Sequence, residues 1–353
     1  MQHNWRLLVD DIHEARYHFA IEEAIARLVD EGDSPPTLRL RRVFPAVFVG
    51  VHQDTWSEVD VDYCKTHGIQ IVRRMNGGGA VYHEMGSFCF SAFFKRETIN
   101  VSDENLYQFF AEPIIQTCLD YGVNASFEGR NDVVVGDRKI YGCAHFTWYQ
   151  IYIQSGTFLI NMNFDTMERV LTPPSIKFFN KPSDSIKKRV TSLSNEVGHE
   201  IDIVEVMTRF ANHTSKILRV QLIHGDLTAK EKVLSNELFQ KKYSTDEWNL
   251  GSKTEFQVTV ADRINDGVLS LSVEMLGNQI LKARIAGDVL HFEDYNIQLV
   301  EETIVSHTIQ EAYKKIKNIE VPVILKETLT RLIYKIEPEI KNVLISRTKV
   351  EKL

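Results

Sequence analysis

Apolar and polar positions along the first half of the chain follow two different periods. Phe19, Ala26 and Val29 recur near helical spacing among good helix formers, and Gly32 ends the run, so residues 14–31 are predicted to form a helix. A second helix is predicted over residues 104–122. Short runs that alternate, or that are apolar and β-branched, predict strands at residues 37–42, 46–51, 69–74 and 88–94.

Shorter apolar runs follow, separated by turn residues. Gly136-Asp137 lies between the runs 132–135 and 138–141, which predicts a hairpin. Residues 148–153 and 156–161 predict a further strand pair joined by Gln154 and Ser155, and residues 203–220 and 228–241 predict helices. Strands and helices intermix without strict β-α-β alternation. We therefore expect an α+β fold: a mixed, largely antiparallel sheet with helices packed on it.

The pattern changes again beyond residue 172. Residues 173–190 contain three prolines, four lysines and one arginine, which predicts a long mobile loop. Residues 248–251 (WNLG) are interpreted as the connection between two parts of the chain. Beyond it, strands are predicted at 256–261, 268–274, 279–285 and 289–292, and helices at 304–318 and 324–336. We expect two domains, a catalytic domain over residues 1–245 and a small α+β accessory domain over residues 246–353.

Composition narrows the class of protein. The chain has 353 residues, is 43% hydrophobic and carries a net charge of −7, which is typical of a globular protein and disfavours nucleic acid as a partner. Four cysteines without a CxxC pair indicate reduced thiols. The first residues lack the pattern of a signal peptide, and no apolar run reaches the length of a membrane span. We expect a cytoplasmic protein without a membrane partner.

The first motif that could carry chemistry is RRMNGGGAVYHE at residues 73–84. Three glycines after a strand allow close backbone approach, and successive N–H groups can hold an anion. The two arginines could pair with a phosphate or a carboxylate. The spacing matches neither a P-loop nor a Rossmann fingerprint. A glycine-rich turn with solvated arginines is the alternative, but the flanking arginines and His83 favour a ligand-binding loop.

The second motif joins GRND (residues 129–132) to RKIYGCA (residues 138–144). Asp132 begins a predicted strand, and its carboxylate could hold a divalent cation beside phosphate oxygens. Lys139 could stabilise negative charge on a reacting oxygen. Taken alone, both residues are better explained by a turn with a solvated lysine.

These motifs, with GVHQD at 50–54, SGTFLIN at 155–161 and KKRVTSL at 187–193, occur in the order and at the spacing of the lipoate–protein ligase family, which this chain resembles over residues 10–200. The segments WNLGSKTEF (248–256) and ARIAGD (283–288) resemble the accessory domain of two-domain ligases. The resemblance implies a fold like that of the biotin and lipoyl ligases. It also implies an ATP-dependent reaction in which lipoate becomes lipoyl-AMP and the lipoyl group passes to a lysine of an acceptor protein.

The resemblance also implies roles for individual residues. Lys139 would contact the acyl carbonyl and the phosphoester, and Asp132 would help to hold Mg²⁺. The cofactor and substrate would be ATP and lipoate, and the acceptors would be lipoyl domains of 2-oxoacid dehydrogenases and the glycine-cleavage H protein. The residues implied to bind lipoate or the adenylate are Arg74, Gly77, Gly78, Gly79, Val81, His83, Asn131, Ala144, Gly156 and Thr157.

Several residues depart from the family pattern and leave alternatives open. Asn76, Asp54 and Ser155 replace the usual Ser or Thr, Asn and His, which leaves room for a changed acyl or acceptor preference. Cys143 is interpreted as a packing residue, although an ATP-independent acyltransferase would need such a thiol as a nucleophile. A sensor that binds lipoate without turnover is a further alternative, which Lys139 disfavours. A basic cluster of Arg73, Arg74, Arg130, Arg138 and Lys139 is expected where the phosphates and the carboxylate meet.

Overall fold

The computed structural model describes residues 3–99, 101–148, 150–172, 185–264, 267–289 and 296–350, and it contains an eight-stranded mixed sheet. The strands lie in the order β11, β1, β2, β6, β10, β9, β8, β7. β1 pairs in parallel with β2 and β11, and the other neighbours pair antiparallel. The bounds are β1 His3–Val9, β2 Thr37–Arg41, β6 Ser87–Lys95, β7 Ser126–Glu128, β8 Asp132–Val135, β9 Arg138–Trp148, β10 Ile151–Leu159 and β11 Val220–His224.

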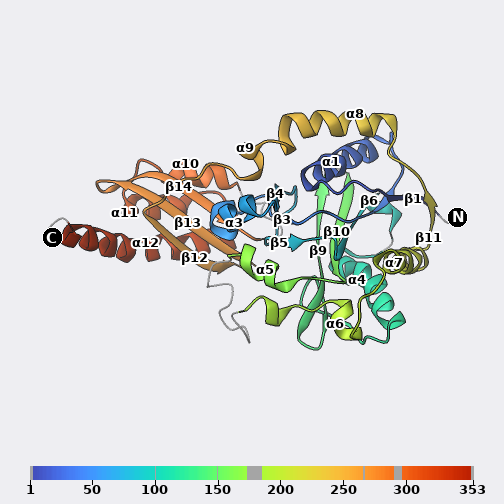
Figure 1. Ribbon diagram of the computed structural model, residues 1–353. Helices are drawn as coiled ribbons and strands as arrows, with labels where there is room; N and C mark the ends of the chain where they lie inside the picture. The colour runs from blue at the N-terminus through green and yellow to red at the C-terminus, as the bar shows by residue number, and fades with distance from the viewer. Residues whose placement is uncertain are drawn as a thin grey trace.

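Helices cover both faces of this sheet, which confirms the predicted α+β class (Figure 1). α1 (Ala15–Glu31) packs on one face, with α8 (Ala229–Leu238) beside it. Glu14 caps the first turn of α1 by accepting from two backbone N–H groups, and Gly32 ends the helix at a φ of 82°. α4 (Asp103–Asp120) and α7 (Ile203–Leu218) pack together over the opposite face, which holds a large apolar core.

A smaller sheet lies beside the first and carries the glycine-rich segment. It consists of β4 (Gln70–Arg73), β3 (Ala46–Val49) and β5 (Val81–His83), in that order. Short elements surround the two sheets. They are α2 Thr55–Glu58, α3 Val61–Thr66, η1 Arg96–Thr98, α5 Phe164–Val170, η3 Lys187–Arg189, α6 Leu193–Val197, the π-helical turn η4 Phe239–Tyr243 and α9 Asp246–Asn249.

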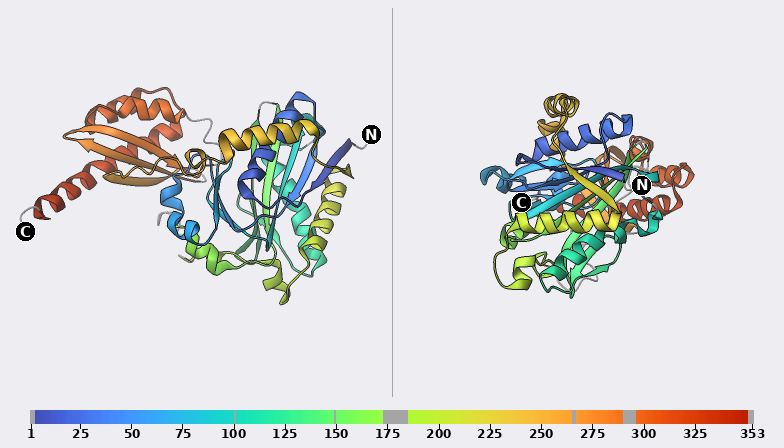
Figure 2. Two further views of the ribbon diagram at one scale, coloured as in Figure 1. Left: turned by 45° about the horizontal axis from the view of Figure 1, so that its top comes forward. Right: turned by 90° about the vertical axis from the view of Figure 1, so that its right-hand side faces the viewer.

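The C-terminal residues build a third sheet with its own core. β12 (Val258–Ile264), β13 (Gly267–Leu276) and β14 (Gln279–Gly287) pair antiparallel. α10 (Ile297–Ile304), α11 (Ile309–Asn318) and α12 (Val323–Val350) contribute to a separate apolar cluster with these strands. Figure 2 shows this unit at one end of the molecule, with the described part of α12 running toward the C-terminus. Gly287 N donates to His52 O over 3.0 Å, so β14 touches the N-terminal part of the chain.

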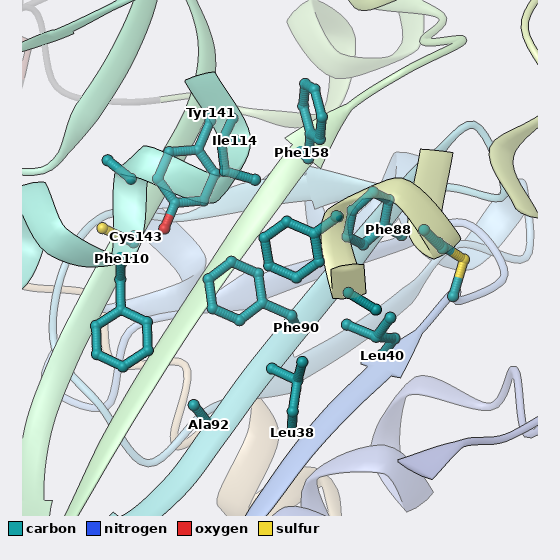
Figure 3. Packing of buried hydrophobic residues seen from close by; sticks show 14 of the residues in the cluster. Leu38, Leu40, Phe88, Phe90, Ala92, Phe110, Ile114, Tyr141, Cys143 and Phe158 are labelled. Carbon is teal, nitrogen blue, oxygen red and sulfur yellow. The ribbon is translucent and has the colours of Figure 1, made fainter. Parts of the chain in front are cut away.

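Alternation along the central strands separates an apolar face from a polar one. In β2, Leu38 and Leu40 belong to the core beneath α4 and α7, whereas Arg39 and Arg41 lie on the opposite face with α1. Figure 3 shows how densely the apolar face is filled by aromatic and aliphatic side chains. The members that it labels from these strands include Leu38, Leu40, Phe88, Phe90, Ala92, Tyr141 and Phe158.

Several predicted elements differ from the structure. Residues 148–153 and 156–161 are not two strands: β10 runs without a break from Ile151 to Leu159, and it pairs antiparallel with β9, which ends at Trp148. The helix predicted over 203–220 ends at Leu218, and β11 begins at Val220. The strands β1, β5 and β7 were not predicted. Residues 173–184 of the predicted loop, and most of the predicted strand at 289–292, lie outside the described residues.

None of the helices in the described ranges has the length and apolar character that crossing a bilayer requires.

Candidate active site

A row of neighbouring residues crosses five strands on the polar face of the large sheet. Arg41 of β2 pairs with Cys89 of β6, Cys89 with Thr157 of β10, and Thr157 with Gly142 of β9. Gly142 in turn pairs with Asp132 of β8. Because residues opposite one another in a sheet point to the same face, this register places Asp132 and Arg41 at the two ends of one line.

A pocket of about 700 Å³ lies over this row. Its walls come from α1, the glycine-rich segment, η3 with Val190, the strands β12 and β13, and Asp288, which follows β14. The residues predicted to bind substrate line this pocket, with the exception of Gly77. They are Arg74, Gly78, Gly79, Val81, His83, Asn131, Asp132, Lys139, Ala144, Gly156 and Thr157. The structure thus brings together residues from four separate segments of the chain.

Lys139 and Asp132 form an ion pair at one end of the row. Lys139 Nζ lies 2.7 Å from Asp132 Oδ1, and the two side chains are 37% and 35% exposed. The lysine lies over Gly142, where a Cβ atom would stand only 2.3 Å from Nζ. The backbone is held as well, because Thr191 N donates to Lys139 O over 2.8 Å. Gly142 therefore leaves the space in which a cation and a carboxylate face the pocket together.

Asn131 fixes the strand that carries this pair. Its side-chain amide donates to Cys143 O, and its own carbonyl accepts from Cys143 N over 3.1 Å. Asn131 is partly buried and lines the pocket beside Asp132. These bonds set the direction in which Asp132 leaves the backbone.

Arg74 organises the glycine-rich loop from within. Its buried guanidinium donates to the carbonyls of Phe48 (2.9 Å), Gly77 (2.7 Å) and Gly79 (2.9 Å). Burial lowers the pKa of Arg74 to about 10, which leaves the side chain charged at neutral pH. Gly78 adopts a φ of 92°, which favours glycine. The loop therefore has a fixed shape and carries a buried positive charge.

Gly50 allows a second loop to approach this one. A Cβ atom on Gly50 would stand 2.1 Å from Gly78 O, so only glycine fits at this position. Arg73 holds the same segment by donating to the carbonyls of Gly50, Val51 and Gln53 over 2.7–3.0 Å.

The expected cluster of five basic residues does not form. The Arg73 donors are occupied by backbone carbonyls and by Thr55 Oγ1, Arg130 lies over the Tyr107 ring at 5.9 Å, and Arg138 pairs with Glu196 at 2.8 Å. Only Arg74 and Lys139 of the five line the pocket. The expectation was wrong for Arg138 because it precedes Lys139 in β9, and adjacent residues of a strand point to opposite faces.

His83 and Cys89 lie together in the buried part of the pocket. His83 Nδ1 is 3.3 Å from Cys89 Sγ, and the imidazole packs against the Phe48 ring with centroids 4.0 Å apart and the ring planes tilted by 32°. Burial lowers the pKa of His83 to about 3, and the charges of Arg41 and Arg74 act in the same direction. His83 is therefore neutral at physiological pH and serves as a wall of the pocket.

Cys143 and Gly156 differ from the other residues of the site because their Cα–Cβ directions point toward the apolar core and not into the pocket. Cys143 belongs to the same apolar cluster as Tyr141 (Figure 3). Burial raises the pKa of the Cys143 thiol to about 12. A Cβ atom on Gly156 would lie 2.5 Å from the Tyr141 ring. Gly156 therefore makes room for a core aromatic side chain while its backbone lines the pocket.

The other end of the row holds a polar network that was not predicted. Arg41 Nη1 lies 3.2 Å from Glu22 Oε1 and donates to Ser91 Oγ over 3.1 Å. Ser91 Oγ donates to Glu22 Oε2 over 2.7 Å and lies 2.9 Å from Ser155 Oγ. The alternation of Leu and Arg in residues 37–41 was the signal that could have revealed this arrangement. Further pocket residues that were missed are Phe48, Glu58, Arg189, Arg263 and Asp288.

Comparison with known proteins agrees with this geometry. A family model of the lipoyl protein ligase A/B catalytic domain matches residues 14–215, more than half of the chain. The chain belongs to the lipoyl protein ligase A/B family. Lipoate-protein ligase A subunit 1 of Thermoplasma acidophilum is 31% identical over 255 residues, which cover 69% of this chain and 95% of that protein.

Solved structures of this family share the fold. A bi-partite lipoate protein ligase from T. acidophilum, described with its E2 lipoyl domain, superposes with a TM-score of 0.62 at 31% identity and covers 72% of this chain and 99% of that chain. Lipoate-protein ligase A bound with ATP gives a TM-score of 0.61 at 29% identity, over 71% and 99%. P. falciparum LipL1 covers 94% and 100% with a TM-score of 0.73 at 20% identity, a likeness of fold alone.

Proposed function

We infer that this chain is an ATP-dependent lipoate–protein ligase. The lipoate carboxylate would attack the α-phosphorus of ATP, giving lipoyl-AMP and pyrophosphate. A lysine amine of an acceptor protein would then attack the lipoyl carbonyl and release AMP. The observation that carries the proposal is the Lys139–Asp132 pair, placed over Gly142 in a pocket that the family motifs line. Family membership and a related structure bound with ATP support it.

Lys139 is the proposed catalytic residue. Both chemical steps build negative charge on oxygen atoms, and a positioned cation lowers the energy of such states. The Thr191–Lys139 backbone bond and the space over Gly142 position this ammonium before the substrate arrives. A partly exposed ion pair is weak in water, so Lys139 can exchange Asp132 for substrate oxygens at little cost.

Asp132 is the proposed ligand of Mg²⁺. The described residues contain no cluster of three or more metal-binding side chains. Mg²⁺ at a nucleotide commonly takes one or two carboxylates together with phosphate oxygens and water. The partly exposed Asp132 carboxylate fits that requirement, because it faces the pocket beside the lysine. When bound, the ion would neutralise charge on the phosphates.

The remaining predicted residues shape the two parts of the substrate site. Arg74 fixes the shape of the glycine-rich loop by donating to its carbonyls, and it adds a buried positive charge. Asn131, together with the backbone of Gly156 and the side chain of Thr157, would lie beside the adenylate. The loop and the acyl channel would be formed by Gly77, Gly78, Gly79, Val81, His83 and Ala144.

The proposed acceptors are proteins that carry a lipoyl domain. The bi-partite relative described with its E2 lipoyl domain supports this class of partner. We include the glycine-cleavage H protein among the acceptors and propose a cytoplasmic location.

Residues 246–353 are proposed to form an accessory domain that closes the pocket. Its sheet and its apolar cluster are separate from those of the catalytic part. Arg263 and Asp288 nevertheless line the same pocket as Lys139. Arg284 Nη1 of β14 lies 3.5 Å from Asp54 Oδ1, so the arginine balances the negative charge of Asp54.

Intact-mass analysis of an acceptor lipoyl domain tests the function. Incubation with the protein, ATP, Mg²⁺ and lipoate should add one lipoyl group, and omission of ATP should abolish the gain. A second reaction without ATP supplies an octanoylated carrier protein in place of lipoate. A mass gain only in that second reaction would contradict the ligase and favour an acyltransferase.

A further inference from the structure

The closed end of the pocket is lined by charged and hydroxyl groups where an acyl chain would have its terminal carbons. Arg41 and Glu22 are buried there, and Ser91 links both of them to Ser155. Arg41, Glu22 and Ser155 all line the pocket. An acyl-binding role for this end rests on the proposed ligase function, because the acyl group belongs to the acid that such a ligase would activate.

The register of the sheet places this end far from the reacting carboxylate. Arg41 on β2 and Gly142 on β9 are separated by three strand spacings, which amounts to about 14 Å at about 4.8 Å per spacing. Lys139 lies over Gly142. An acyl chain with its carboxylate at Lys139 and its carbons along the row therefore extends toward Arg41.

Arg41 has donor capacity that the protein does not use. Its described contacts are made by Nη1. Within the described residues, the buried Nε has no hydrogen-bond partner, and neither has the buried Nε2 of His83, which lines the same pocket. A hydrogen bond from a charged donor that otherwise stays unpaired strengthens binding roughly tenfold or more. An alkyl terminus would leave the Arg41 donor unpaired, whereas an acceptor would satisfy it.

Ser155 offers the complementary group. Because the single hydroxyl proton of Ser91 points to Glu22, the 2.9 Å contact between the two serines requires Ser155 to donate to Ser91. The lone pairs of Ser155 then face the pocket. A ligand hydroxyl could accept from Arg41 and donate to Ser155.

The charges at this end are already balanced. Glu22 faces Arg41 and Arg39, each at 3.2 Å, and Arg39 Nε lies 2.8 Å from Asp10 Oδ2. His18 contacts Arg39 through Nδ1 and is neutral, since burial, with Arg39 and Arg41, holds its pKa well below the ordinary value. Two cations thus meet two carboxylates, so a ligand carboxylate would find no surplus positive charge.

We propose that the acyl site selects a medium-chain acid that carries a neutral hydrogen-bonding group at its far end. Arg41 and Ser155 are its specificity-determining residues. A hydroxyl satisfies both of them, the ring sulfur of lipoate accepts weakly, and the methyl terminus of octanoate does neither.

Adenylation kinetics with three acids test this proposal. Pyrophosphate release is measured with octanoate, lipoate and 8-hydroxyoctanoate, and kcat/KM is compared. We expect 8-hydroxyoctanoate to exceed octanoate by about tenfold or more, with the difference mainly in KM. A wild-type protein that uses octanoate equally well or better would overturn the proposal, and this measurement needs no variant.

Variants then assign the selectivity to residues. The double variant Glu22→Leu/Arg41→Met removes both members of the buried pair and should reverse the preference in favour of octanoate. Ser155→Ala should reduce the preference for 8-hydroxyoctanoate severalfold, and it should disturb the fold less than the double variant does. Arg209→Met, at an exposed ion pair on α7, is the matched control and should keep the wild-type ratio. An unchanged ratio in both Ser155→Ala and the double variant would contradict the assignment. Absence of pyrophosphate release with all three acids would instead overturn the ligase function.

Discussion

The two ends of the cross-strand row each hold one acid and one base, and they differ in their access to water. Lys139 and Asp132 are 2.7 Å apart and more than a third exposed. Arg41 and Glu22 are 3.2 Å apart and only 3% and 4% exposed. The same two charge types therefore experience strongly different solvation within one pocket.

This difference separates a pair that can react from a pair that shapes the site. Charges in contact with water exchange partners easily, because their mutual attraction is screened. Charges without water depend on each other, since removal of one leaves the other buried and unpaired. The open end of the pocket, which holds Lys139 and Asp132, can therefore release its lysine to a substrate. The closed end, which holds Arg41 and Glu22, presents a fixed set of donors and acceptors.

Removal of the lysine at the open end should have the largest effect. Lys139→Ala is expected to lower the rate of pyrophosphate release with lipoate and ATP by about a thousandfold, because one positioned charge-stabilising group typically contributes two to three orders of magnitude. Urea unfolding should change by less than about 1 kcal/mol. Lys230→Ala, which removes a lysine from an exposed pair with Asp33, is the control. Retained pyrophosphate release in Lys139→Ala would contradict the proposed role.

Neutralising one carboxylate at each end should separate the two regions by stability. Glu22→Gln is expected to lower the free energy of unfolding by about 3 kcal/mol, since Arg41 and Arg39 lose a buried counter-charge. Asp132→Asn is expected to cost less than about 1 kcal/mol. Urea denaturation of both variants measures the difference. Equal losses would show that burial does not distinguish the two pairs.

Acid should act on the closed end through His83. Its folded-state pKa of about 3 lies below the unfolded value of about 6.5, so the unfolded state binds the proton first. The contribution of His83 to stability is complete above pH 6.5 and is lost as the pH falls toward 3. Between pH 7 and 5 this loss amounts to about 2 kcal/mol. Urea unfolding at both pH values should show a correspondingly smaller decrease for His83→Gln, and identical decreases would disprove the assignment.

The open end could be predicted from the sequence because its parts are local. Asp132 and Lys139 belong to one hairpin whose turn is visible at Gly136-Asp137, and Gly142 follows three residues later. The glycine-rich segment is recognisable for the same reason. Short-range patterns carry this information, because turn chemistry and spacing determine which residues meet.

The closed end could not be predicted because its parts meet only through the register of distant strands. Arg41, Ser91 and Ser155 lie on β2, β6 and β10, and Glu22 reaches them from α1. A shift of one residue in β2 would have placed Leu40 in the pocket and Arg41 in the core.

The smallest effect is expected from a residue beside the open end that faces the other way. Cys143 lies four residues after Lys139, but its thiol belongs to the core face and donates to Asn131 O over 3.4 Å. With a pKa of about 12, almost no thiolate exists at neutral pH, so the thiol is a poor nucleophile. Cys143→Ser keeps a donor for Asn131 O and should change the lipoylation rate by less than about threefold, as read by intact mass of the acceptor. Loss of acyl transfer in Cys143→Ser, with the fold intact by circular dichroism, would mean that the acyl group passes through a thioester, and the ligase mechanism at Lys139 would have to be abandoned.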